Sequence, residues 1–290
     1  MGEFLGAVLK YSFMQNAVFA GVLASLASGL IGTYVVVKRI TFISGGIAHT
    51  VLGGMGVAYY LGVDPLAGAI VAALGAAVLL GFVNVKAKQH EDTIIGALWA
   101  VGMAVGIVFM SLTPGYNVDL MSFLFGNILM VTNPVLRILI YLDLSIILLV
   151  TVFYRQFLLI AFDEEHARLR GLPVTFLYIL LLCLIALTVV ILIKIVGLIM
   201  VIALLTLPAA IAGLFTHTLG YMMGAATGLS LVFTLGGLAV AYNLDLPAGA
   251  VIVITAGLAY LLALGGQKLF INRLKAKAEK ETQPSDGSLA

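Results

Sequence analysis

His49 is the residue whose surroundings in the sequence point most directly to chemistry. It lies in the apolar segment 40–63, which contains no Asp, Glu, Lys or Arg. A neutral imidazole suits zinc and other borderline metal ions, and an ionisable group inside an apolar span is a candidate functional residue. The alternative is a core histidine that hydrogen-bonds to a neighbouring helix, and both interpretations stay open at this point.

Four carboxylates lie between or beside the apolar segments. Asp119 and Asp245 fall on one expected side of a membrane, where they could attract a cation. Glu91 and Asp92 fall on the other side, directly before the segment that begins at Thr93. They could form part of an exit for an ion, although capping of the following helix is the preferred interpretation. Helix-cap or loop roles are equally open for Asp119 and Asp245.

A third group of polar residues occupies the longest polar loop, at about 162–171. Asp163 is a natural N-cap, Glu164 and Glu165 follow in the first turn, Arg168 falls in the last turn, and Gly171 can end the helix. The pattern predicts a short surface helix. It could be a solvated connector or a docking element for a cytoplasmic partner.

The elements that position these residues are predicted to be transmembrane helices. Hydrophobic residues make up 62% of the 290 residues and charged residues only 10%, against about 25% charged residues in soluble domains. A span needs roughly 20 apolar residues, and in lipid the backbone of such segments must be helical. Nine segments qualify, or eight if one is re-entrant or merged with its neighbour: Tyr11–Val37, Ile40–Val63, Leu66–Val85, Thr93–Leu112, Ile138–Tyr154, Leu172–Ile193, Ile195–Thr216, Thr218–Asn243 and Leu246–Gln267. We therefore predict an all-α polytopic membrane protein with 8–9 transmembrane helices.

Basic residues predict the orientation of the chain. Most of the Lys and Arg residues fall after the first and third segments, in the 155–170 loop and after residue 267. The positive-inside rule then places the N-terminus outside and the C-terminus in the cytoplasm. Residues 1–270 are expected to form one membrane domain, and the polar residues 271–290 a disordered cytoplasmic tail.

Several classes of function are disfavoured by what the sequence lacks. It has no phosphate-binding G-x-x-x-x-G-K-[ST] loop, no H-E-x-x-H pair and no plausible Ser/His/Asp set, and Cys183 is its single cysteine. Acid-rich spans typical of proton-coupled carriers or channel filters are also missing. We therefore expect a non-enzymatic subunit that depends on a gradient or on an energy-supplying partner.

Short motifs in a fixed order give a family resemblance over roughly residues 13–266. The sequence resembles the permease subunits of ABC importers for zinc, manganese and iron, and is most similar to the zinc permeases, with a type II importer-like fold. The motifs are Ala48–Gly54, Glu91–Gly96, Val118–Gly126, the loop at 162–171, Leu207–Ala210 and Asp245–Gly249.

The resemblance implies an assembly in a prokaryotic cytoplasmic membrane. This subunit would form a homodimer around the ion path, contact two ABC ATPase subunits, and receive metal from an extracytoplasmic binding protein. ATP would be used by the ATPase, with no cofactor bound by this subunit and no nucleic acid involved. The resemblance implies zinc as cargo, with manganese or iron as alternatives, and His49 on the path. It implies that the loop helix is the coupling helix, which contacts the ATPase through Asp163, Glu164, Glu165, Ala167, Arg168 and Gly171.

Two other functions stay open. The first is an ABC permease for a metal chelate such as a siderophore or cobalamin. The second is an ion-gradient-driven carrier or channel that has no ATPase.

One position departs from the family pattern. Many relatives carry an Asp four residues before the histidine, which places a carboxylate and an imidazole on one helical face. This sequence has Gly45 there. A two-ligand site within this helix is therefore excluded, and any metal contact is weak, shared across a dimer or transient.

Overall fold

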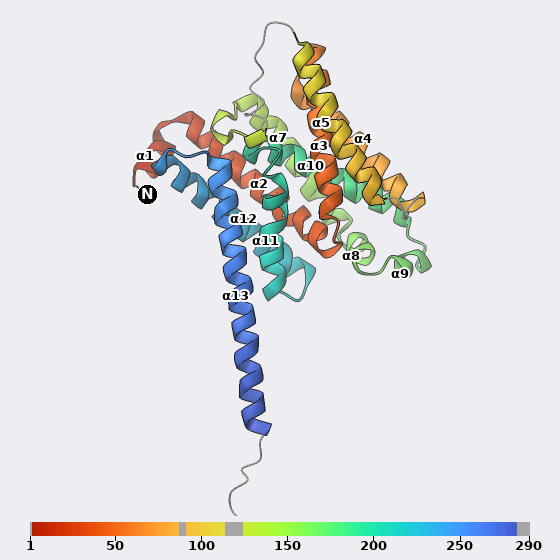
Figure 1. The fold of residues 1–290 in the computed structure, drawn as a ribbon, viewed down its shortest axis with the longest axis vertical. Helices are drawn as coiled ribbons and strands as arrows, with labels where there is room; N and C mark the ends of the chain where they lie inside the picture. The colour runs from red at the N-terminus through yellow and green to blue at the C-terminus, as the bar shows by residue number, and fades with distance from the viewer. Residues whose placement is uncertain (1, 87–90, 114–123, 283–290) are drawn as a thin grey trace, which may run out of the picture.

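Helices account for all the regular structure in the part of the chain that is described. The computed structural model describes residues 2–86, 91–113 and 124–282 (Figure 1). Within these ranges no strand occurs, which confirms the all-α prediction. The helices are α1 (Gly2–Lys10), α2 (Ser12–Val37), α3 (Thr41–Tyr60), α4 (Pro65–Lys86), α5 (Glu91–Leu112), α7 (Asn133–Val152), α8 (Tyr154–Phe162), α9 (Glu164–Leu169), α10 (Val174–Val196), α11 (Val201–Phe215), α12 (Leu219–Leu244) and α13 (Ala248–Thr282), with a 3-10 turn η2 at Ile128–Met130.

Eight of the described helices are long and apolar enough to cross a membrane. The ninth predicted segment, Ile195–Thr216, corresponds to α11, which is shorter. Its 15 residues extend only about 22 Å at 1.5 Å per residue. Helix α10 extends through Val196, and the turn that follows contains the buried residues Leu198 and Met200. Irregular backbone is tolerated at membrane depth when it is enclosed by protein.

Helix α3 packs closely against α5 and α4 because glycines face one another across both contacts. A β-carbon at Gly53 would lie 2.8 Å from the carbonyl oxygen of Gly102, and one at Gly56 would lie 2.5 Å from that of Gly106. On the α4 side, a β-carbon at Gly54 would collide with Gly68. Small residues let membrane helices approach to backbone contact, and this explains the glycines around His49.

The ends of several helices meet at a second glycine junction, at the end of the bundle where α10 stops. Gly126 and Gly197 both have positive φ values, 66° and 85°. A β-carbon on either residue would overlap the backbone of the other, and one at Gly249 would lie 2.9 Å from the carbonyl oxygen of Val196. The start of α13 therefore lies at the end of the bundle where α10 stops.

The remaining helices complete the bundle around α2 and α10. Ser28 of α2 and Ser230 of α12 are buried and share a hydrogen bond of 2.8 Å between their hydroxyl oxygens. Helix α1, which we did not predict, contacts α2 and α12 and inserts Phe4 against Tyr242, with ring centroids 6.0 Å apart. The boundary at residue 270, predicted between the membrane domain and a disordered tail, falls inside α13, which continues as helix to Thr282.

Candidate functional site

His49 lies on α3 where this helix faces α5. Its side chain is 8% exposed. Its Nδ1 atom lies 3.0 Å from the Sδ atom of Met103. The imidazole also stacks on Trp99, with ring centroids 3.9 Å apart and an interplanar angle of 15°. Trp99 and Met103 are four residues apart on α5, so they lie on the same face of that helix.

Trp99 also occupies the space beside Gly45. A β-carbon at Gly45 would lie 2.9 Å from the Cζ3 atom of Trp99 and 3.1 Å from the Cδ1 atom of Ile202 on α11. Contacts under about 3 Å force a neighbour to move, so the indole ring and a side chain at position 45 compete for one volume. The volume that a carboxylate side chain at position 45 would need is therefore occupied by the Trp99 ring.

The donors around His49 are few. Among the residues described, no group of three or more His, Cys, Asp or Glu side chains could hold a metal ion. The atoms nearby that could contact a cation are the imidazole nitrogens, the Met103 thioether and the face of the Trp99 ring. This arrangement suits passage of a cation better than tight retention.

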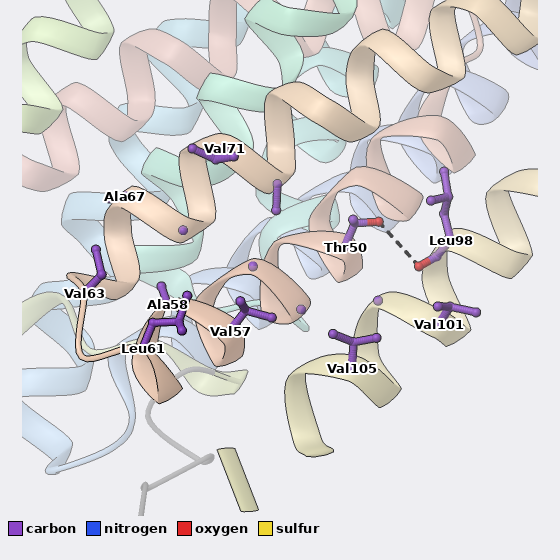
Figure 2. A pocket seen from close by; sticks show the side chains of 15 residues that line it. Thr50, Val57, Ala58, Leu61, Val63, Ala67, Val71, Leu98, Val101 and Val105 are labelled. Atoms are coloured by element: carbon purple, nitrogen blue, oxygen red, sulfur yellow. Dashed lines mark hydrogen bonds between the residues drawn. The ribbon is translucent and has the colours of Figure 1, made fainter. Parts of the chain in front are cut away.

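An apolar pocket of about 530 Å³ opens between α4 and α5, with α3 as its floor (Figure 2). Thr50 contributes the one polar side chain among its lining residues. The Thr50 hydroxyl donates to the carbonyl oxygen of Gly46 at 2.8 Å, with that of Leu98 at 3.4 Å. Figure 2 shows Val57 and Ala58 of α3, Leu61 directly after it, and Val101 and Val105 of α5 around the opening. A cation would meet almost no polar group there, so this pocket is a poor route for an ion.

The predicted surface helix is present as α9. The Asp163 carboxylate accepts a hydrogen bond of 2.8 Å from the backbone N–H of His166, as expected of an N-cap. Gly171 follows the helix with a φ of 74°, a backbone conformation that favours glycine. Glu165 and Arg168 are exposed, and Glu164 is half-buried.

Ala167 and Leu169 occupy opposite environments on α9. Ala167 is fully buried, so it packs α9 against the rest of the subunit rather than offering a contact surface. The exposed apolar residues are Leu169 at 86% and Phe162 at 67%. Sequence reasoning missed both, although a leucine at the end of a short charged helix is itself a signal for a contact surface.

Lys38 ties α9 to the turn that precedes α3. Its ammonium group lies 2.8 Å from a carboxylate oxygen of Glu164 and donates to the carbonyl oxygen of Ile160 at 2.6 Å. The Lys38 side chain is only 8% exposed. It borders a polar pocket of about 300 Å³ that is also lined by Asn84 and Asp92. The pair was not predicted because 126 residues separate its members.

The other predicted carboxylates are dispersed. Asp92 is exposed and lies in the first turn of α5 on the α9 side of the molecule, while Glu91 is the first residue of that helix. Asp245 ends α12 with a left-handed backbone and is exposed. Asp119 lies outside the described residues. Of this set, Asp92 and Asp245 do not join His49.

A polytopic helical chain with a capped polar helix at one end and a buried histidine within a span has the architecture of a membrane transport subunit. The chain belongs to the ABC 3 transport family, whose profile matches residues 10–267. This confirms the resemblance to permease subunits of metal-ion ABC importers.

Three similar proteins illustrate the relationship. An uncharacterised membrane protein of Synechocystis sp. is 48% identical and covers 91% of this chain and 94% of its own length. The manganese transport system membrane protein MntC of Listeria monocytogenes is 34% identical, covering 90% of this chain and 92% of its own. The solved structure of PsaBC from Streptococcus pneumoniae in complex with a Fab matches with a TM-score of 0.82 at 31% identity, covering 90% of this chain and 94% of that one.

Proposed function

We propose that this chain is the permease subunit of an ATP-driven importer for a divalent transition metal, with zinc as the expected cargo. Membership of the ABC 3 family and similarity to a manganese transport protein support metal import. The imidazole and thioether at the candidate site support zinc over manganese, which prefers oxygen ligands. Manganese and iron are the alternative cargoes. ATP is hydrolysed by a partner, so the chain itself is not an enzyme.

The observation that carries this proposal is the link between α9 and the helix that bears His49. Lys38 holds Glu164 and the carbonyl oxygen of Ile160, while the chain enters α3 at Thr41, three residues after Lys38. A displacement of α9 would therefore be passed to the start of α3 through an ion pair whose lysine is buried. An ATPase that moves α9 would in this way change the position of His49.

The proposed assembly follows from this arrangement. Two copies of the chain would enclose the path, and two ATPase subunits would contact the exposed residues of α9, including Glu165, Arg168 and Leu169. An extracytoplasmic metal-binding protein would deliver the ion near Asp245. Glu91 and Asp92 would lie by the inner exit. The N-terminus is outside and the C-terminus in the cytoplasm of a prokaryotic cell.

Reconstitution tests the proposal. The chain is purified together with an ABC ATPase subunit that copurifies with it and placed in vesicles, and uptake of radioactive zinc is measured with and without ATP. We expect ATP-dependent uptake that falls several-fold at limiting zinc in His49→Ala, while His217→Ala, which changes a histidine outside the predicted path, leaves it unchanged. Normal uptake by His49→Ala at limiting metal would remove His49 from the path.

The same experiment separates the alternatives. Uptake that continues without ATP, with no ATPase copurifying in mild detergent, would identify a gradient-driven carrier or channel. Uptake of a metal chelate but not of the free ion would identify a chelate permease.

A further inference from the structure

The surroundings of His49 differ from those of an ordinary buried histidine. A core imidazole is expected to use its ring nitrogens in good hydrogen bonds, because an unsatisfied buried polar group is costly. Here Nδ1 faces a thioether sulfur at 3.0 Å, and sulfur is a weak hydrogen-bond partner. The imidazole nitrogen and the sulfur are thus held close together, but the hydrogen bond between them is a weak one.

These donors lie near the surface of the single subunit. Helix α5 has only 22% of its span buried, and both Trp99 and Met103 on it are half-buried. His49 lies directly beneath them, and its ring face is covered by Trp99. The Trp99 ring is therefore the group that would have to move for an ion to reach this face of the imidazole.

We propose that His49 and Met103 are the paired side-chain donors that the cargo contacts at this level of the membrane, with Trp99 as their movable cover. This inference deepens the proposed function and rests on it. An imidazole and a thioether together suit borderline and soft cations, whereas Mn²⁺ prefers carboxylate, carbonyl and water oxygens. Because residue 45 is glycine, the preceding turn of α3 supplies no carboxylate to the pair. The site therefore discriminates for Zn²⁺ against Mn²⁺.

The alternative is a packing role, in which Met103 fills space beside two aromatic rings, as methionine often does, and does not contact the cargo. The two interpretations differ in what a leucine at position 103 would do. Leucine has a similar volume and keeps the packing, but it removes the sulfur. Met110 provides a matched control, because it lies on the same helix and is 5% exposed.

Trp99 offers a direct signal for binding, since it is the only tryptophan of the chain. The full chain in detergent is titrated with Zn²⁺ or Mn²⁺ while tryptophan emission is followed. We expect a saturable change with Zn²⁺ and none with Mn²⁺ in the same concentration range. In Met103→Leu the zinc midpoint should rise about tenfold or more, as loss of one ligand implies, and Met110→Leu should match the original protein. Absence of any zinc-dependent change in the original protein would overturn the site.

Transport in vesicles with the ATPase supplies the second readout. Met103→Leu should raise the zinc concentration for half-maximal uptake and lower the zinc-to-manganese uptake ratio, with membrane abundance and ATP hydrolysis retained. An unchanged ratio and an unchanged half-maximal concentration would overturn the role of Met103 while leaving the proposed function standing. Failure of the original protein to take up any metal with ATP would instead overturn the proposed function. The emission titration would still show whether Zn²⁺ binds at His49 and Met103.

Discussion

At the scale of single residues, the buried polar groups of the spans divide into satisfied and unsatisfied ones. Most of the threonine and serine hydroxyls return to a carbonyl oxygen one turn back, as Thr188 does to Leu184 at 2.9 Å. His49 contacts the sulfur of Met103 instead of a carbonyl oxygen, and Asp143 does not follow the pattern at all. Asp143 of α7 is 1% exposed, and its Oδ1 atom accepts no hydrogen bond from any residue that the structure describes. Burying a carboxyl group without a partner lowers stability, so a substitution at Asp143 can show whether this residue destabilises the protein.

Asp143→Leu is expected to stabilise the protein. A buried polar atom without a partner costs about 1–3 kcal/mol, and leucine fills a comparable volume in an apolar helix. Thermal unfolding in detergent should therefore shift to a higher temperature, while Asp143→Asn, which puts a polar amide in the same place, should gain little. A lower unfolding temperature for Asp143→Leu would mean that the carboxyl group has a stabilising partner after all.

At the scale of elements, the sequence predicted which segments are helices much better than how they face one another. Eight of the nine predicted apolar segments correspond to helices long enough to span, because length and hydropathy decide spanning, and the ninth contains the shorter α11. The Asp163 cap of α9 was also predicted, since capping is local. The contact of His49 with Trp99 and Met103 depends on how α3 and α5 are rotated, which the glycine packing sets and hydropathy does not. A search for titratable residues also passes over methionine and tryptophan.

The Lys38–Glu164 pair is the element-scale contact with the clearest consequence, because it joins α9 to the chain that enters α3. Removing Glu164 from this ion pair leaves the buried Lys38 ammonium group without its charge partner. We expect Lys38→Glu and Glu164→Lys each to lower zinc uptake several-fold in vesicles while ATP hydrolysis continues. Uptake per ATP hydrolysed is the quantity to measure.

The double variant Lys38→Glu/Glu164→Lys is the control for that pair. It restores opposite charges across the same gap, so uptake per ATP hydrolysed should recover in part. If the double variant is no better than the single variants, or if the single variants transport normally, the pair does not transmit motion from α9.

At the scale of the whole molecule, the directions of the helices fix where the chain ends lie. Asn16 near the start of α2 donates to the carbonyl oxygen of Val131 at 3.2 Å, whereas Lys38 at its end contacts α9. Helix α13 begins against Val196 and runs past the level of α9, so α1 and the far end of α13 lie at opposite ends of the bundle (Figure 1). This requires α11 to return the chain across the bundle although it is short. Eight crossings alone would put both ends on one side.

Cysteine labelling tests this nine-pass orientation. Cys183 is the single cysteine, so Cys183→Ser gives a background for one new cysteine at a time. Leu9→Cys and Leu246→Cys alter residues that are 83% and 49% exposed, at the end of the bundle expected to face outside. In intact cells both should react with a membrane-impermeant maleimide. Leu169→Cys, at a residue 86% exposed on α9, and Lys277→Cys should react only after permeabilisation, as the positive-inside rule requires. Labelling of Leu9→Cys and Lys277→Cys from the same side would show that α11 does not carry the chain across, and the path proposed from α9 to His49 would need a different topology.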